Sequence, residues 1–100
     1  MAVTAHKSRG NTVKVNENFV TLIGFVNPTN TPLTDCGAWI DFGNGTQVEL
    51  KCQPIIKPGE SVKMKASTSI KRPGKKNLLA VLETSEIQNI RGSFQINVTN

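Results

Sequence analysis

The sequence predicts an all-β fold, a seven-stranded antiparallel immunoglobulin-like β-sandwich, and three observations predict it. Apolar and polar residues alternate along several stretches, which is the period-two pattern of a strand with one buried and one solvated face. Turn-forming Gly, Pro and Asn residues separate the apolar stretches, at the spacing of roughly 8–12 residues that is typical of such sandwiches. No apolar stripe with a period of 3.6 residues develops, so a helical fold is not favoured.

The seven expected strands differ in how clearly they alternate. The first along the chain, at residues 12–15, is expected to be short. Two are apolar on nearly both faces and are expected to be central, at 19–26 and 78–82. Four more alternate along the chain, at 36–42, 47–53, 62–71 and 90–99. We expect a short helical turn at 84–89.

The residues between these strands have the chemistry of turns. They form five groups: Asn16 to Asn18, Asn27-Pro28, Gly43 to Gly45, Pro58-Gly59 and Pro73-Gly74. Asn44-Gly45 predicts a type I′ hairpin turn. At the corner before Cys36, Pro28 and Pro32 fix φ, and we expect Asn27 and Asp35 to bond local backbone groups.

Length and composition place limits on domain organisation. One hundred residues form one domain with a single core. Residues 1–10 are polar and unpatterned and are expected to be a flexible tail or linker remnant, followed by the sandwich at 11–100. Apolar residues make up 37% of the chain and no run approaches a membrane span. No signal-peptide pattern is visible, and the compartment is left unassigned.

The net charge of +5 comes largely from two groups of cations. Lys63, Lys65 and Lys71 share one phase of a strand. Around the Pro73-Gly74 turn lie Lys71, Arg72, Lys75 and Lys76. These cations form either a polyanion-binding patch or, in the favoured interpretation, a solvated strand face that discourages aggregation. No aromatic residues flank them for base stacking, so no nucleic-acid partner is expected.

The sequence offers no set of groups for catalysis or metal binding. The only histidine, His6, lies in the expected tail, where it has no fixed position from which to act as a base. Cys36 and Cys52 lie on the apolar phase of their strands, where a thiol is inert. Acidic residues are scattered, without the spacing of a calcium loop. We therefore expect no catalytic, cofactor-binding or metal-binding residue.

The state of the two cysteines has two interpretations. A disulfide bond would close a loop of about 15 residues and stabilise the fold by roughly 3 kcal/mol. Two buried free thiols are the commoner arrangement for a chain with so few cysteines, and we favour it.

Trp39 is the only tryptophan. It shares its phase with Gly37 and Asp41, whereas Ala38 and Ile40 point the other way, so we expect it to face outward. Two interpretations stay open: an interface residue, or a side chain covered by a loop of its own domain.

Five motifs in order resemble the C-terminal β-sandwich, the second β-barrel, of animal transglutaminases. They are Phe25 to Pro28, Pro32 to Cys36, Pro58 to Glu60, Arg72 to Leu79, and Gly92 to Val98. The resemblance covers residues 12–98, nearly the whole expected domain. No single motif is specific, and their order and spacing carry the resemblance.

The resemblance implies an accessory part of an enzyme. The parent would be a calcium-dependent protein-glutamine γ-glutamyltransferase, a protein cross-linking enzyme of the cytoplasm or the extracellular space. Its catalytic triad and calcium ligands belong to the core, so none is assigned here. We expect this non-catalytic domain to dock on the catalytic core and the preceding β-sandwich and to modulate active-site access or partner binding. The candidate interface residues are Trp39, Lys63, Lys65, Lys71 and Arg72.

The alternative is a free-standing immunoglobulin-like extracellular module that binds matrix or polyanions. The basic residues near Pro73 suggest it.

Overall fold

The computed structural model describes residues 3–43 and 47–100. It contains ten strands rather than the expected seven, because three short strands add to those predicted. The ten are β1 (Thr4–Lys7), β2 (Thr12–Lys14), β3 (Phe19–Val26), β4 (Leu33–Thr34), β5 (Gly37–Asp41), β6 (Gln47–Leu50), β7 (Ile55–Ile56), β8 (Ser61–Thr68), β9 (Gly74–Glu83) and β10 (Ile90–Thr99). In the described part of the chain, no helix is long and apolar enough to cross a membrane.

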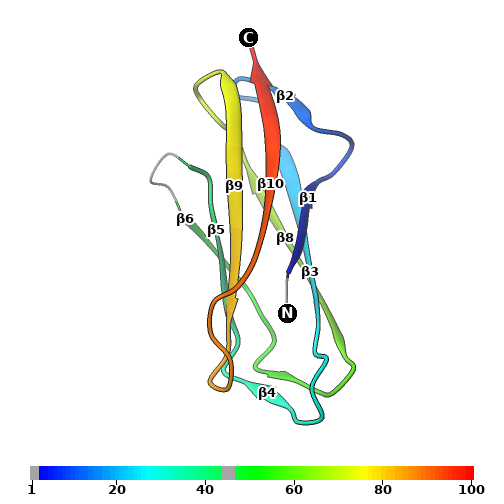
Figure 1. Ribbon diagram of the computed structural model, residues 1–100. Coiled ribbons are helices and arrows are strands. Elements are labelled where there is room, and N and C mark those ends of the chain that lie inside the picture. The colour runs from blue at the N-terminus through cyan, green and yellow to red at the C-terminus, as the bar shows by residue number, and fades with distance from the viewer. Residues whose placement is uncertain (1–2, 44–46) are drawn as a thin grey trace.

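The strands form two packed layers, as an immunoglobulin-like sandwich requires (Figure 1). One layer is a five-stranded sheet in the order β2-β10-β9-β5-β6, and the other is a three-stranded sheet in the order β1-β3-β8. Strands β4 and β7 form a separate two-stranded ribbon at one end of the molecule. The expectation of a purely antiparallel fold is wrong in one place, because β2 runs parallel to β10.

The N-terminal residues correct a second expectation. Residues 1–10 were expected to be a flexible tail, but Thr4–Lys7 forms β1 and pairs with β3 along its whole length. The chain then crosses from one sheet to the other to form β2, and Arg9 and Gly10 make this step with positive φ angles of 63° and 84°.

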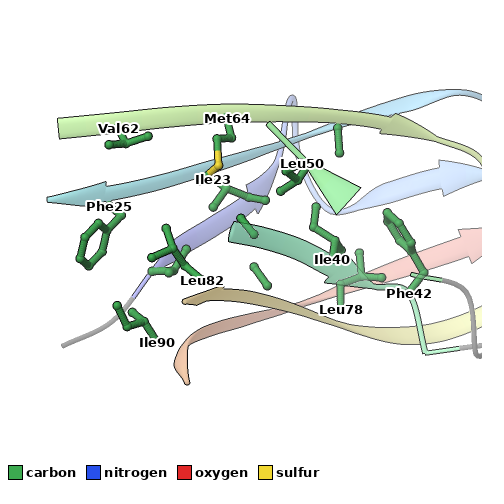
Figure 2. Close-up of a cluster of buried hydrophobic side chains, with 14 of the residues drawn as sticks. Ile23, Phe25, Ile40, Phe42, Leu50, Val62, Met64, Leu78, Leu82 and Ile90 are labelled. Atoms are coloured by element: carbon green, nitrogen blue, oxygen red, sulfur yellow. The ribbon is translucent and has the colours of Figure 1, made fainter. Parts of the chain in front are cut away.

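The core lies between the two sheets (Figure 2). In β8, Val62, Met64 and Ala66 are buried while the intervening residues are exposed, so the predicted alternation is confirmed. Figure 2 shows Val62 and Met64 pointing across the interior toward the side of the core that holds Leu78 and Leu82 of β9. Both leucines belong to the core-facing row of β9 and are fully buried.

The cysteines correct a third expectation. Cys36 and Cys52 form a disulfide bond, with their Cα atoms 5.6 Å apart, instead of the two free thiols that we favoured. Both residues are half-buried and lie just outside their strands. Each lies in a connection that leads to or from the β4–β7 ribbon, so the bond holds the two connections together.

The turn predicted at Pro58-Gly59 is present in the structure. At Lys57 to Glu60, Gly59 has φ of 75° and the backbone N–H of Glu60 donates to the carbonyl of Lys57 at 3.0 Å. This is a type II turn, as Pro58 and Gly59 predict. The type I′ turn predicted at Asn44-Gly45 lies outside the described residues. The helical turn expected at 84–89 is wrong, because bends and irregular backbone occupy these residues.

Hydrogen bonds to β4 explain why residues 84–89 are not helical. The carboxylate of Glu86 accepts the backbone N–H and the hydroxyl of Thr34, each at 2.6 Å, and the N–H of Ser85 donates to the Thr34 carbonyl. The hydroxyl of Ser85 donates to the carboxylate of Asp35 at 2.6 Å. Asp35 therefore bonds a distant hydroxyl rather than the local backbone groups that we expected.

Candidate interaction surfaces

Trp39 projects from the outer face of the five-stranded sheet. Its neighbours Ala38 and Ile40 are buried in the core while Trp39 is half-buried, which confirms that it faces outward. It lies opposite Glu49 of β6 and Val81 of β9. Val81 also faces outward, yet it is only 5% exposed, so its neighbours on this face shield it from water.

The surface around Trp39 combines apolar and acidic side chains. Asp41 lies two residues along β5, and Glu83 of β9 is paired with Gly37. We call this surface the tryptophan face; its residues are Trp39, Asp41, Glu49, Leu79, Val81 and Glu83. A large aromatic side chain beside apolar neighbours is a common feature of protein interfaces.

Lys63 and Lys65 project from the outer face of the other layer. They are exposed on β8, opposite Gly24 and Leu22 of β3. Two shallow hollows of about 420 and 440 Å³ adjoin here, and both are lined by Thr4, Gly24 and Lys63. A Cβ atom on Gly24 would lie 2.9 Å from Oγ1 of Thr4. Because Gly24 has no side chain, the space between Thr4 and Lys63 in the two hollows stays open.

We call this second surface the lysine face; its residues are Thr4, His6, Leu22, Gly24, Val26, Lys63 and Lys65. Val26 is 52% exposed and is one of two large apolar side chains exposed to that degree among the described residues. None of the residues that line the two hollows is acidic. The lysine face is therefore basic at its rim and partly apolar at its floor, whereas the tryptophan face carries three carboxylates.

His6 is a surface residue of β1, although we expected it to lie in a flexible tail. It is exposed on β1, opposite Leu22, and lines one hollow of the lysine face together with Lys65. The alternation of Val3 and Ala5 with Thr4 and His6 was a weak signal for this strand. Lys7 obscures that signal because it occupies an inward-facing position.

The burial of Lys7 has a physical explanation. Its ammonium group donates hydrogen bonds to the backbone carbonyls of Ser8 and Arg9, at 3.1 and 3.3 Å. The aliphatic stem is covered while the charge is satisfied by carbonyl dipoles. Opposite Lys7, the buried hydroxyl of Thr21 has no hydrogen-bond partner among the described residues.

Lys71 and Arg72 lie in the connection between β8 and β9. They line a hollow of about 700 Å³ at the end of the sandwich, together with Lys76 at the start of β9. We call it the basic hollow; its lining includes Phe42, Thr68, Ser69, Lys71, Arg72 and Lys76. Figure 1 shows the β8–β9 connection at the end of the molecule opposite β4.

The structure therefore divides the five predicted interface residues among three places. It brings Lys63 together with Lys65, and Lys71 together with Arg72, but Trp39 projects from the opposite layer. They do not form one continuous patch. Their role in binding stays a prediction.

Two carboxylates have shifted protonation equilibria for structural reasons. Hydrogen bonds from the hydroxyl and the backbone N–H of Thr34 hold the pKa of Glu86 below its ordinary value. The backbone N–H of Lys57 lowers the pKa of Glu60 in the same way. A lowered pKa keeps a carboxylate charged and ready to accept hydrogen bonds, so both groups suit the anchoring of loops rather than proton transfer near neutral pH.

The described residues include no free cysteine and no group of three or more His, Cys, Asp or Glu side chains that could hold a metal ion.

Comparisons with known proteins give a fold but no family. No protein-family model and no curated protein matches the chain. Among solved structures, a transglutaminase of red sea bream superposes with a TM-score of 0.89 and 21% identity over 100% of this chain. The match spans 15% of the transglutaminase chain, so this chain corresponds in size to a small part of that protein.

Other modules share the fold. The CARDB domain of the PF1109 protein of Pyrococcus furiosus superposes with a TM-score of 0.76 and 16% identity, over 97% of this chain and 94% of that one. The PKD domain of an M14-like peptidase of a Thermoplasmatales archaeon gives a TM-score of 0.70 and 14% identity, over 99% and 94% of the two chains. At these identities the likeness is one of fold. At that level it confirms the resemblance to a transglutaminase β-sandwich.

Proposed function

We propose that this chain is a non-catalytic accessory domain of a calcium-dependent protein-glutamine γ-glutamyltransferase, a protein cross-linking enzyme. The observation that carries the proposal is the superposition of the whole chain on a segment of a transglutaminase, with a TM-score of 0.89 against 0.76 and 0.70 for the CARDB and PKD domains. The five ordered sequence motifs point to the same family. In this role the domain docks on its parent and modulates access to the active site.

The chemistry of the chain agrees with an accessory role. Cross-linking by a cysteine enzyme needs a thiolate with a base within hydrogen-bond reach. The sulfur atoms of Cys36 and Cys52 are bonded to each other, so neither is a nucleophile in this state. His6 projects from the lysine face. The nucleophile of the reaction therefore belongs to the catalytic core.

The two outer faces give the domain two docking surfaces. Because the tryptophan face and the lysine face belong to opposite layers, each can contact a different neighbour: the catalytic core and the preceding β-sandwich. Trp39 supplies aromatic contact area. Lys63 and Lys65 favour an acidic partner surface. Interfaces between domains of one chain bury roughly 600–1,500 Å² and tolerate motion, which suits a domain that opens and closes over an active site.

The proposal is tested in the full-length parent enzyme. We expect Trp39→Ala, and separately the pair Lys63→Gln and Lys65→Gln, to raise the radius of gyration measured by X-ray scattering and to change the cross-linking rate. The matched control is the pair Lys14→Gln and Lys57→Gln, which removes two exposed charges outside both faces. If neither face variant differs from the control in shape or in rate, docking through these faces is wrong.

A second function, a free-standing extracellular module that binds matrix or polyanions, is favoured by the disulfide bond. Disulfides persist in oxidising environments such as the cell exterior. This function predicts that the isolated chain is retained on immobilised heparin at low salt and released as salt screens its charges. Passage through the column without retention would exclude it.

A further inference from the structure

The basic hollow is placed where the two sheets part at one end of the sandwich. Its walls come from the end of the β8 strand, the β8–β9 connection, the start of β9 and the residues that follow β5. Phe42 and Ile70 line it but are buried members of the core. The hollow therefore ends on a closed apolar floor.

Lys76 occupies an unusual position in this hollow. It belongs to the row of β9 that continues as Leu78, Ala80 and Leu82, all of them buried in the core. It is paired with Ile96, another core residue. Lys76, at the end of this core-facing row, is half-buried and lines the hollow. Lys71 of the β8–β9 connection and Lys75 of β9, in contrast, are exposed.

The charges around the hollow have one sign. Lys71, Arg72 and Lys76 line it, and none of its lining residues is acidic. The carboxylate of Asp41 lies close along the chain, but its Oδ1 atom accepts the backbone N–H of Gly43 at 2.8 Å. Cations gathered around one hollow repel each other, and a bound anion relieves that repulsion.

The remaining groups complete a site for oxyanions. Thr68 and Ser69 place hydroxyl groups in the lining, and these donate hydrogen bonds without adding charge. The planar guanidinium of Arg72 suits two oxygens of one sulfate or phosphate group, while the lysines act as point charges. The volume of about 700 Å³ lies within the range of small-molecule sites, roughly 300–1,000 Å³, and exceeds the space that one inorganic ion fills.

We propose that the basic hollow binds a sugar that carries several sulfate or phosphate esters. One ester group lies between Lys71, Arg72 and Lys76, and the rest of the sugar occupies the hollow beside Thr68 and Ser69. This site does not depend on the accessory role, because binding needs only the isolated chain. Failure of the docking tests in the parent enzyme would therefore not contradict the anion site. Failure of the anion-binding tests would likewise not contradict docking.

The test is a calorimetric titration of the isolated chain at low salt with sucrose octasulfate, inositol hexakisphosphate, inorganic sulfate and inorganic phosphate. We expect the two polyanionic esters to bind, and the two inorganic ions to bind at least about tenfold more weakly because each makes fewer charged contacts. Amide NMR shifts are expected to concentrate at residues 68–72 and 76. Inorganic ions that bind as tightly as the esters would overturn the assignment to a sugar ester.

Matched variants separate this site from general attraction to a basic protein. The triple change of Lys71, Arg72 and Lys76 to Gln is expected to weaken octasulfate binding by about tenfold or more. The control changes Lys14, Lys63 and Lys65 to Gln, which removes the same charge elsewhere, and is expected to weaken binding only about twofold. Equal losses in the two triple variants, or no binding by the unchanged chain, would overturn the proposal. If the triple variant does not fold, Lys76→Gln alone replaces it, provided that its circular dichroism spectrum is unchanged. Its octasulfate binding is then compared with that of the control.

Discussion

The side-chain amide of Asn27 donates a hydrogen bond of 2.9 Å to the backbone carbonyl of Ile56, 29 residues along the chain. The same amide group donates to the carbonyl of Thr31, and its oxygen accepts both the N–H and the hydroxyl of Thr29. Asn27 is fully buried. One side chain thus satisfies backbone groups of the β3–β4 corner and of β7, and it fixes the corner with no reactive group.

We predict that Asn27→Ala lowers the free energy of unfolding by about 2–4 kcal/mol, because each buried polar group left without a partner costs roughly 1–3 kcal/mol. Urea denaturation of the isolated chain measures this loss. The control is Asn30→Ala in the same corner, where the side chain is exposed, and its effect is expected to stay within about 0.5 kcal/mol. A loss at position 27 no larger than at position 30 would contradict the proposed role of the side chain.

The period-two pattern predicted most of the fold because it reports directly on burial. Residues such as Met64 and Ile96 are buried where alternation placed them, and Lys63 is exposed. All seven predicted strands are found. The pattern failed for the N-terminal strand, since Lys7 is buried and donates its hydrogen bonds to backbone carbonyls that no sequence pattern marks.

The sequence could not predict which residues far apart in the chain lie close together. Cys36 and Cys52 lie in connections whose approach depends on how β4 and β7 pair, and two residues per strand carry too little pattern to predict that pairing. For the candidate surfaces, too, local direction was predictable but the arrangement in space was not. Alternation gave the outward direction of Trp39, but only the sheet order shows that Trp39 and Lys63 lie on opposite layers.

The disulfide bond should contribute substantially to stability. Its two cysteines are 16 residues apart, and a closed loop of about 15 residues corresponds to roughly 3 kcal/mol in the chain-entropy model. We predict a loss of about that size when a reducing agent is added, or in the double variant Cys36→Ala and Cys52→Ala, measured by urea denaturation. The control is the double variant with and without the reducing agent, which should give one curve. Equal stability of the oxidised and reduced chains would show that the bond does not constrain unfolding.

The anchor between Glu86 and Thr34 predicts a dependence of stability on pH. Because the pKa of Glu86 is lower in the folded chain than its ordinary value of 4.5, the charged form stabilises the fold. This contribution is present above the pKa of the unfolded chain and is lost as the pH falls through the lower pKa of the folded chain. We therefore expect Glu86→Gln to destabilise the chain at pH 7, and the difference from wild type to shrink as the pH falls to 2.5. An equal difference at both pH values would show that the charge of Glu86 is not responsible.

Gly92 allows the N-terminal segment at Val3 to pass close to the first residues of β10. A Cβ atom at position 92 would clash with the backbone oxygen of Val3, and the N–H of Val3 donates to the carbonyl of Arg91. Any side chain at this position must therefore displace the segment that leads into β1.

We predict that Gly92→Ala destabilises the chain by about 1–3 kcal/mol, which is the usual cost of overpacking, and increases amide exchange in Thr4–Lys7 before the rest of the fold. The control is Gly37→Ala, where an added Cβ atom meets no atom within 4 Å and φ is not positive; it is expected to be neutral or slightly stabilising. Hydrogen exchange measured by mass spectrometry, together with urea denaturation, distinguishes the two variants. Unchanged protection of Thr4–Lys7 in Gly92→Ala would mean that another segment yields to the new methyl group, and that β1 does not depend on this crossing.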